Sequence, residues 1–262
     1  MWTFPNIDPI AFQIGPLAVR WYGLMYIFGF VGGFFVARWL ARKRNLSFSN
    51  EQLAEFISYV AIGVVLGGRL GYVIFYNLPY YLAEPLRIFA FWEGGMSFHG
   101  GMLGAMLAGW LWVRNQRLPF YPAADCIFAA APLGLGLGRL GNFINGELYG
   151  RPTDAPWGMV FPGGGPLPRH PSQLYEAFLE GAVLLVFLAW LGTRVRLPGV
   201  VTWAFIGGYG VVRFAVEFFR EPDAHLGLAW GLSRGQYLSA AMIVAAAAFL
   251  WMLFRRSAKP AR

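Results

Sequence analysis

The chain has 262 residues, of which 57% are hydrophobic and only 13% are charged. Its mean hydropathy is +0.50, and this excludes an ordinary soluble domain and indicates a protein that crosses a membrane several times. The net charge of +8 does not indicate nucleic-acid binding, because the basic residues cluster in short loops between apolar segments. The single cysteine, Cys126, excludes an internal disulfide and a metal site built from several thiolates.

Residues 1–20 are too mixed in polarity to span a bilayer, and their apolar side chains predict an interfacial arm on the membrane surface. No basic region precedes the first apolar segment, so we expect no cleavable signal peptide. Seven apolar segments have the length of a membrane helix. We expect an all-α polytopic membrane protein in which residues 1–262 form a single transmembrane domain. The predicted spans are residues 21–41, 53–76, 96–113, 124–144, 173–193, 199–220 and 236–254.

The basic residues predict the orientation of these spans. With the N-terminus outside, the inner loops and tail hold eleven Lys and Arg residues, whereas the outer segments hold six. This excess predicts an N-out, C-in topology. The longest segment without a span, residues 145–172, is then external, and its Gly and Pro content predicts a small periplasmic cap and no helix. The eleven inner residues are Arg42, Lys43, Arg44, Arg114, Arg117, Arg194, Arg196, Arg255, Arg256, Lys259 and Arg262.

Three arginines lie inside predicted spans, namely Arg69, Arg139 and Arg213. A charge at the middle of a membrane helix costs roughly 2.5–3.5 kcal/mol, so three imply a gross cost of about 8–10 kcal/mol. We expect a buried polar chamber that holds an anion to offset this cost. The predicted topology brings polar side chains from five helices to one depth, in the outer half of the membrane. They are Tyr22, Arg69, His99, Arg139, Asn142, Glu147, Tyr209, Arg213 and Glu217.

Two of the predicted helices carry polar residues at helical spacing. Tyr209, Arg213 and Glu217 recur at every fourth position and line one helix face, where Arg213 and Glu217 can pair. This pair either joins helices structurally, or it lets Glu217 orient an arginine that binds a ligand. In residues 138–147, Arg139 and Asn142 share a face beside glycines that permit close packing or a ligand near the backbone. The alternative there is a polar helix end that only caps.

The segment of residues 93–101, EGGMSFHGG, opens the third predicted span and surrounds His99 with glycines. These glycines leave room for a substrate to reach the imidazole. His99 is either an interfacial residue satisfied by hydrogen bonds or a proton acceptor near neutral pH. A single histidine with scattered carboxylates is too little for a metal site.

Three glycines in the second predicted span, Gly63, Gly67 and Gly71, are four residues apart and predict a helix-packing seam. Arg69 beside them is either a packing residue or a ligand contact. Cys126 lies far from the predicted polar chamber, so we expect an inert structural thiol.

The arginines indicate phosphate, because a guanidinium offers parallel, charge-assisted hydrogen bonds and stays charged. A phosphate at outer-leaflet depth belongs most simply to a phospholipid. The residues alone do not separate an enzyme from a transporter of phospholipids or organic anions. A transporter predicts two repeated halves and coupling-ion sites, and no clear internal repeat is found in the sequence. A seven-helix retinal protein is disfavoured because residues 236–254 contain no lysine.

The chain resembles the prolipoprotein diacylglyceryl transferase family over essentially its whole length. The motifs that carry the resemblance are WYGLMY (residues 21–26), GGMSFHGG (94–101), GRLGNFINGE (138–147), RHPSQLYE (169–176) and GYGVVR with Glu217 (208–217). The resemblance implies transfer of a diacylglyceryl group from phosphatidylglycerol to the lipobox cysteine of a preprolipoprotein signal peptide, with release of glycerol-1-phosphate. It implies no metal, nucleotide or other cofactor, and a place in the bacterial inner membrane among lipids, with the active site toward the periplasm.

The resemblance also implies site residues. Arg139 and Arg213 correspond to a critical pair. We expect Arg139 to hold the headgroup phosphate and Arg213, oriented by Glu217, to stabilise the departing group or the thiolate. His99 is the candidate base, and Tyr22 positions it or the lipid. The supporting positions are Tyr22, His99, Asn142, Glu147, Gly150, Tyr209 and Glu217.

Overall fold

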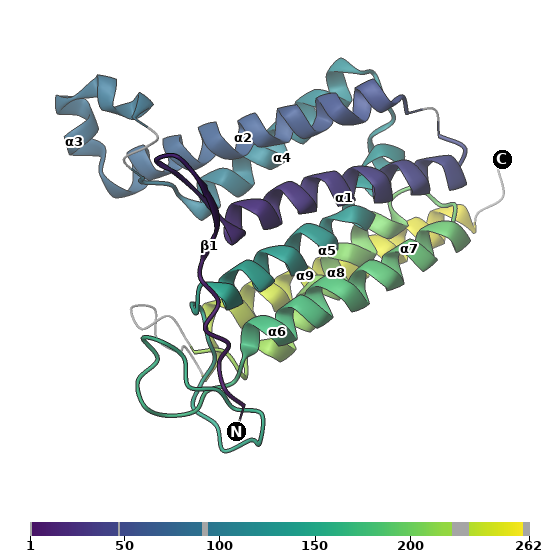
Figure 1. Cartoon of the computed structure of the whole chain (residues 1–262). Helices are drawn as coiled ribbons and strands as arrows, with labels where there is room; N and C mark the ends of the chain where they lie inside the picture. Colours follow the sequence, from purple (N-terminus) through teal and green to yellow (C-terminus); the bar gives the residue numbers. More distant parts are fainter. Residues whose placement is uncertain (1, 47, 91–93, 222–230, 259–262) are drawn as a thin grey trace. The chain divides into compact units, whose positions relative to one another are not determined.

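The structure is a computed structural model that describes residues 2–46, 48–90, 94–221 and 231–258 (Figure 1). The described residues are mostly helical, as predicted, and they form two compact units. The first unit combines Met1–Leu46 with Ala124–Arg262, and the second comprises Ser47–Ala123. Lys259, Arg262 and Glu93, which figured in the sequence analysis, lie outside the described residues.

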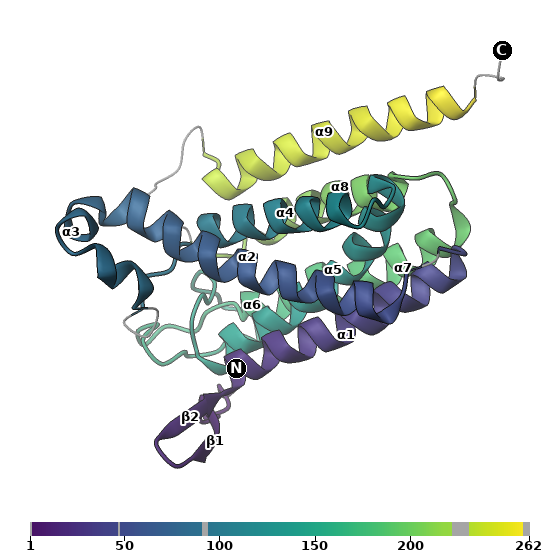
Figure 2. The same ribbon diagram turned by 90° about the horizontal axis from the view of Figure 1, so that it is seen from above.

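The first unit is built from long helices that run side by side (Figures 1 and 2). Helix α8 packs along α9, and α7 contacts both α1 and α8. A π-helix, η3, continues α6 into α7 without a break, so these three elements form one helix over Ser172–Arg194. The helices are α1 (Trp21–Lys43), α5 (Phe120–Ile144), α6 (Ser172–Glu176), η3 (Ala177–Val183), α7 (Leu184–Arg194), α8 (Val200–Val216) and α9 (Arg234–Ser257). The first four residues of α5 belong to the second unit.

The second unit centres on two helices, α2 (Asn50–Tyr76) and α4 (Phe98–Asn115). Between them in the chain come α3 (Leu78–Ala83) and the 3₁₀ helix η1 (Pro85–Phe89). The glycines of α2 contact α4. A Cβ added to Gly63 would lie 2.5 Å from the carbonyl oxygen of Gly104, and one added to Gly71 would lie 2.8 Å from the Cα of Gly100. The predicted glycine seam is therefore confirmed, and it lets the two backbones touch.

Each of the seven predicted spans contains a helix, although some bounds differ. Helix α4 begins at Phe98, later than predicted, because the Ser97 hydroxyl caps it by accepting a hydrogen bond from the Gly100 N–H at 3.2 Å. Helix α8 ends at Val216, earlier than predicted, because the chain then turns to pair Arg220 with Gly150.

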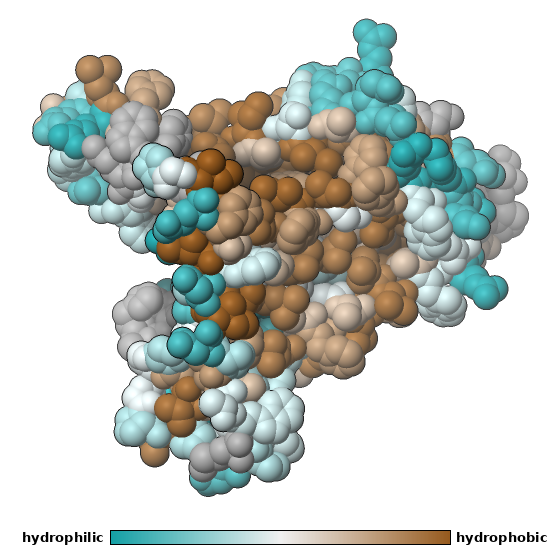
Figure 3. All heavy atoms as spheres, in the orientation of Figure 1, coloured by the Kyte–Doolittle hydropathy of each residue, from teal (hydrophilic) through white to brown (hydrophobic). Residues whose placement is uncertain are grey.

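Five helices of the described chain are long and apolar enough to cross a membrane: α1, α2, α5, Ser172–Arg194 and α9. Helix α8 is apolar but has 17 residues, and α4 has 18 residues that include four glycines. Figure 3 shows hydrophobic side chains over the middle of α1 and hydrophilic ones at its ends. Such exposed apolar faces need a non-aqueous partner, and this agrees with a membrane protein. On α1 the exposed apolar residues include Tyr26, Ile27, Phe28, Val31, Phe35 and Trp39.

The N-terminal arm departs from the all-α expectation, because it contains a two-stranded antiparallel hairpin of β1 (Ile10–Ile14) and β2 (Leu17–Arg20). Gly15, with φ of +59°, and Pro16 form the turn between paired Ile14 and Leu17. The alternation of apolar residues at positions 10, 12 and 14 is a strand pattern that the sequence analysis did not use.

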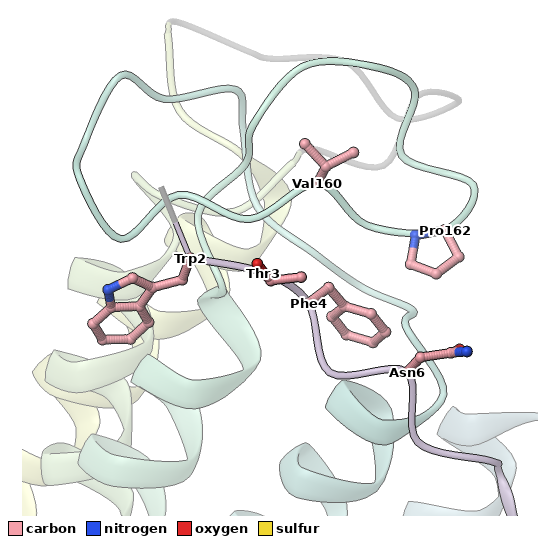
Figure 4. A pocket seen from close by; sticks show the side chains of 6 residues that line it. All are labelled: Trp2, Thr3, Phe4, Asn6, Val160 and Pro162. Atoms are coloured by element: carbon pink, nitrogen blue, oxygen red, sulfur yellow. The ribbon is translucent and has the colours of Figure 1, made fainter.

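Residues 145–171 form a loop at the end of the first unit where α5 ends and α6 begins. A hydrophobic cluster of Phe143, Met159 and Phe161 anchors it, and Phe4 of the arm packs on Phe161 with ring centroids 5.0 Å apart. Figure 4 shows the arm beside this loop, where they border a pocket of about 360 Å³. The side chains that line the pocket are Trp2, Thr3, Phe4, Asn6, Val160 and Pro162.

Candidate functional site

Arg213 lies on the last turn of α8 and Glu217 directly follows the helix, at the end of the first unit that carries the 145–171 loop. Arg213 Nη2 is 3.0 Å from Glu217 Oε2, so the ion pair predicted from their i, i+4 spacing is confirmed. Glu217 also accepts a hydrogen bond from the Ser233 hydroxyl at 2.9 Å, just before α9 begins. Helix α9 thus fixes the carboxylate that orients Arg213.

Two buried glutamates face Arg213 from the neighbouring helix, and the sequence analysis did not assign either of them to the site. Glu176, the last residue of α6, accepts a hydrogen bond from Arg213 Nη1. Glu180, one turn later in η3, has its Oε1 3.8 Å from the same nitrogen. Both glutamates are fully buried. Glu176 belongs to the motif RHPSQLYE, so the resemblance pointed to its segment but not to its role.

Arg139 of α5 joins the same two carboxylates. Its Nε lies 3.3 Å from Glu176 Oε2 and 3.6 Å from Glu180 Oε2. A backbone contact between α5 and η3 makes this possible, because a Cβ on Gly181 would lie 2.7 Å from the Cα of Gly136. The π-helical turn of η3 holds Glu180 beside Gly181, and π-helical turns of this kind often occur at functional sites.

Arg220 is the third arginine of this centre. Its Nη1 donates to Glu176 Oε1 at 3.0 Å, and its Nε lies 3.8 Å from Glu217 Oε2. Gly150 fixes the backbone here, since an added Cβ would lie 2.8 Å from His170 Cβ and would also clash with the Phe219 carbonyl oxygen. Gly150 therefore supports the site by permitting this close approach, and it holds the segment that carries Arg220.

We call this set of three arginines and three glutamates the Arg–Glu cluster; it comprises Arg139, Glu176, Glu180, Arg213, Glu217 and Arg220. Three negative charges oppose three positive ones, and this balances the arginines inside the chain. The sequence analysis expected a bound anion to offset the burial cost and, apart from Glu217, did not consider these carboxylates. Even so, the arginine side chains remain 11–19% exposed, so guanidinium surface is left for a ligand.

Asn142 and Glu147 contact each other at the end of α5. Asn142 Nδ2 donates to Glu147 Oε1 at 2.9 Å, and Asn145 Nδ2 donates to the same oxygen at 3.0 Å. The Gln173 side chain donates to the Glu147 carbonyl oxygen at 2.7 Å and ties this turn to α6. Asn142 thus lies three residues beyond Arg139 on the same helix, and Glu147 follows the end of that helix.

Two predicted tyrosines border the cluster. Tyr22 packs on α5, where a Cβ on Gly141 would lie 2.8 Å from Tyr22 Cδ2, and its hydroxyl lies 3.2 Å from that of Tyr26. Tyr26 in turn interacts electrostatically with Arg139. Tyr209 of α8 interacts electrostatically with Glu180 and Arg213. The first unit contains eight of the ten predicted site residues: Tyr22, Arg139, Asn142, Glu147, Gly150, Tyr209, Arg213 and Glu217.

Arg69 belongs to the second unit, where its side chain is 1% exposed and surrounded by backbone carbonyls. It donates to the Ile88 oxygen at 2.8 Å, the Arg87 oxygen at 2.6 Å and the Ala90 oxygen at 3.0 Å, and also to the Gly94 oxygen. Carbonyl oxygens thus offset its charge, and its guanidinium orders the segment after α3. These contacts match the packing alternative of the sequence analysis.

His99 also belongs to the second unit, where it is exposed on the first turn of α4. Gly94 and Gly95 before it have φ of +80° and +77°, so glycine is required by this backbone. Cys126 is a buried free thiol on α5. Within the described ranges, no group of three His, Cys, Asp or Glu side chains is arranged to hold a metal ion.

The sequence model of one family, prolipoprotein diacylglyceryl transferase, matches residues 9–252. The chain belongs to this family. It is 57% identical over 258 residues to the phosphatidylglycerol–prolipoprotein diacylglyceryl transferase of Geobacter sulfurreducens, covering 98% of this chain and 99% of that protein. The proteins of the same name from Photobacterium profundum and Pseudomonas paraeruginosa are 54% and 52% identical, with at least 97% of each chain covered.

Proposed function

We propose that this protein transfers the diacylglyceryl group of phosphatidylglycerol to the lipobox cysteine of a preprolipoprotein, with release of glycerol-1-phosphate. The observation that carries the proposal is the Arg–Glu cluster, which sits in a chain of the transferase family. A guanidinium surface that is partly open suits a phosphate, and the carboxylates behind it hold the arginines in place.

The orientation of the site rests on charge. In the first unit, one end of the helix bundle carries Arg42, Lys43, Arg194, Arg255 and Arg256, and the cluster lies at the opposite end. An excess of basic residues marks the cytoplasmic side. This supports an N-out, C-in protein of the bacterial inner membrane with seven spans, in which residues 145–172 cap the site on the periplasmic side.

The chemistry that the cluster supports is displacement at carbon. The substrate thiol loses its proton, and the sulfur attacks the carbon of the diacylglyceryl group that is bonded to the phosphate oxygen. That carbon–oxygen bond breaks, its electron pair stays on the phosphate, and glycerol-1-phosphate leaves with one more negative charge than the bound diester. Arginines placed beforehand around this phosphate stabilise the developing charge. Because the nucleophile comes from the substrate, the enzyme needs no reactive cysteine of its own.

We assign the individual roles as follows. Arg139 holds the headgroup phosphate, and Arg213, oriented by Glu217, stabilises the departing oxygen. The Asn142–Glu147 pair and Tyr209 bound the lipid headgroup. His99 accepts the thiol proton.

Tyr22, which packs on α5 at Gly141, positions the lipid. Arg69, with donors directed at carbonyl oxygens, orders the backbone of residues 87–90.

The test is a direct reaction. The purified protein is incubated with phosphatidylglycerol and a lipobox peptide, and the peptide mass and released glycerophosphate are measured. We expect a thioether adduct carrying the diacylglyceryl mass, and an equal amount of glycerol-1-phosphate. A peptide whose cysteine is replaced by serine is the matched control and should stay unmodified. Folded protein that binds both substrates but forms no adduct would refute the proposed activity and favour a lipid transporter, which predicts movement of intact phosphatidylglycerol across a vesicle bilayer.

A further inference from the structure

Glu180 is the least satisfied member of the Arg–Glu cluster. Its side chain is 0% exposed, and neither carboxylate oxygen has a hydrogen-bond partner among the described residues. Its nearest cationic contacts are Arg139 Nε at 3.6 Å and Arg213 Nη1 at 3.8 Å. A carboxylate removed from water keeps its charge only while cations or donors offset the cost of burial. Glu180 therefore depends on two guanidinium groups that it does not bind tightly.

Glu176, one turn away, is held differently. It accepts hydrogen bonds from Arg213 and Arg220, and it lies 3.3 Å from Arg139. All three arginines of the cluster thus contact this one carboxylate. An anion that enters the cluster therefore displaces Glu180 from Arg139 and Arg213 before it displaces Glu176. Glu176 stays bound and anchors the arginines.

The charged and titratable groups around Glu180 come from every element that packs on it. Helix α5 contributes Arg139, α8 contributes Tyr209 and Arg213, and α6 contributes Glu176, while Glu217 and Arg220 follow α8. With all glutamates ionised, the cluster carries no net charge. A phosphodiester monoanion would leave it with one uncompensated negative charge, and a glycerol-1-phosphate dianion with two.

We propose that Glu180 takes up one proton when the phosphate of an anionic phospholipid enters the Arg–Glu cluster. The proton comes from the surrounding water and converts the carboxylate to a neutral carboxylic acid, so charge and atoms balance. Arg139 and Arg213 are then free to turn their donors to the phosphate oxygens, and Glu176 continues to anchor them. The inference rests on the proposed function, because it assumes that the ligand is a lipid phosphate.

Proton uptake has a purpose in the transfer reaction. The bound diester becomes a more highly charged monoester when the carbon–oxygen bond breaks, and a buried anion beside the phosphate would oppose this change. A neutral Glu180 leaves the arginine charge available to the leaving group. After the product departs, the arginines again face a carboxyl group, which releases its proton and restores the neutral cluster.

The experiment measures proton uptake on binding. The full-length protein in detergent is titrated with short-chain phosphatidylglycerol by calorimetry, in two buffers of different ionisation enthalpy at about pH 7. The difference in heat gives the number of protons taken up per lipid. We expect about one proton per lipid, and an affinity that falls about tenfold for each pH unit of increase. Separate titrations with glycerol-1-phosphate and inorganic phosphate distinguish a site for the lipid headgroup from one for free phosphate.

Three variants assign the proton. Glu180→Gln imitates the protonated side chain, so it should bind phosphatidylglycerol at least as tightly as the parent with no proton uptake. Glu176→Gln removes the shared anchor and should weaken binding about tenfold or more. Glu221→Gln, a carboxylate that is 47% exposed and paired with Arg169, is the matched control and should behave as the parent protein.

The outcomes separate the inference from the proposed function. A parent protein that binds phosphatidylglycerol without proton uptake, or a Glu180→Gln variant that keeps the full uptake, would overturn the role of Glu180 while leaving the lipid site intact. Failure of the parent to bind the lipid at any pH would instead refute the proposed function. The parent measurement needs no mutation, so poor folding of Glu180→Gln would not leave the inference undecided.

Discussion

Helix α8 has a buried charged centre at each end, and the two centres differ in how completely they are satisfied. At the start of α8, Asp125 accepts hydrogen bonds from the Gly199 N–H at 2.9 Å, the Thr202 N–H at 2.9 Å and the Thr202 hydroxyl at 2.8 Å. Arg44 Nη1 lies 3.0 Å from the same carboxylate, and both side chains are buried. At the other end, the arginines of the Arg–Glu cluster stay partly exposed, and Glu180 has no hydrogen bond within the described part of the chain.

The difference separates a structural ion pair from a ligand site. Asp125 caps the N-terminus of α8, where the helix dipole favours an anion, and one arginine balances its charge. Both oxygens of the Asp125 carboxylate accept hydrogen bonds, so this anion is satisfied without a ligand. The Arg–Glu cluster has spare donors and a weakly held carboxylate, so a ligand can add to it. Burial of charge alone therefore does not mark function, whereas incomplete satisfaction of buried charge does.

We call the Arg44–Asp125 pair at the start of α8 the satisfied centre. Breaking it should give the largest effect on folding. Asp125→Asn removes the partner of buried Arg44, and breaking a buried pair typically costs about 3–5 kcal/mol of stability. We expect a marked loss of thermal stability and nearly unchanged transfer per folded molecule. Melting temperature and specific activity, measured on the same preparation, test this. Asp154→Asn, at an exposed position, is the control. A stable but inactive Asp125→Asn protein would place this end of α8 in the reaction.

Breaking the Arg–Glu cluster, the open centre, should reduce transfer strongly and stability little. Arg139→Lys keeps a positive charge but loses the planar fork, and loss of one such donor typically costs about 2.7–4 kcal/mol in the transition state. We expect transfer to fall about 10²- to 10³-fold, with the melting temperature changed little by comparison. The adduct-forming rate at saturating lipid measures the loss. Arg87→Lys, in an exposed pair with Glu84, serves as the comparison. Near-normal transfer by Arg139→Lys would contradict the phosphate role.

The backbone contact that positions the open centre offers a third test. Gly181→Ala places a Cβ 2.7 Å from the Cα of Gly136, and a backbone atom cannot move aside as a side chain can. The two helices must separate, at a cost of about 1–3 kcal/mol, and Arg139 then moves away from Glu180. We expect both stability and transfer to fall. Gly134→Ala, which has open space around its Cβ, should be neutral or slightly stabilising. A fully active Gly181→Ala protein would show that the spacing of α5 and η3 is not critical.

The sequence predicted the helices and one ion pair of the open centre, but not the hairpin or the roles of two glutamates. Periodic apolar segments predicted where the helices lie, and the i, i+4 rule predicted the Arg213–Glu217 pair. The hairpin in residues 10–20 was not predicted, because its strands are only five and four residues long and give a weak apolar alternation. The roles of Glu176 and Glu180 were missed for another reason. Their segment reads as an apolar span, and their partners lie on other helices, beyond the reach of local spacing.

The satisfied centre was missed because its members look ordinary alone. Arg44 was counted as one more basic loop residue, and Asp125 was a lone carboxylate at the start of a predicted span. Only the fold brings them together, 81 positions apart in the chain, at the first turn of α8. The sequence left Arg69 open between a packing residue and a ligand contact. Its carbonyl partners are on Arg87, Ile88, Ala90, Gly94 and Gly95, which lie 18–26 positions further along the chain, beyond the reach of local spacing.

The smallest expected effect concerns His170, which borders the open centre through the Gly150 backbone. Its Nδ1 lies 3.1 Å from the Tyr175 hydroxyl, and its ring packs against Phe219 with centroids 5.2 Å apart. Burial lowers the pKa of the His170 imidazole from its ordinary value. The unfolded chain therefore binds a proton at a higher pH than the folded protein does, so stability should fall as pH drops below the ordinary histidine pKa of about 6.5. The loss should level off below the folded-state pKa.

Melting temperature measured from about pH 8 to about pH 5 reports this dependence. His170→Phe keeps an aromatic ring without a titrating nitrogen. We therefore expect its melting temperature to fall less as the pH is lowered than that of the parent protein. Because Gly150 contacts both His170 and the segment of Arg220, acid should loosen the open centre before the satisfied one. Hydrogen exchange at pH 5 should then rise first at Arg151, whose N–H donates to the Phe219 oxygen, and later at Thr202, whose N–H donates to Asp125. Equal exchange at both amides would mean that acid acts on the fold as a whole, and the two ends of α8 would not be independent.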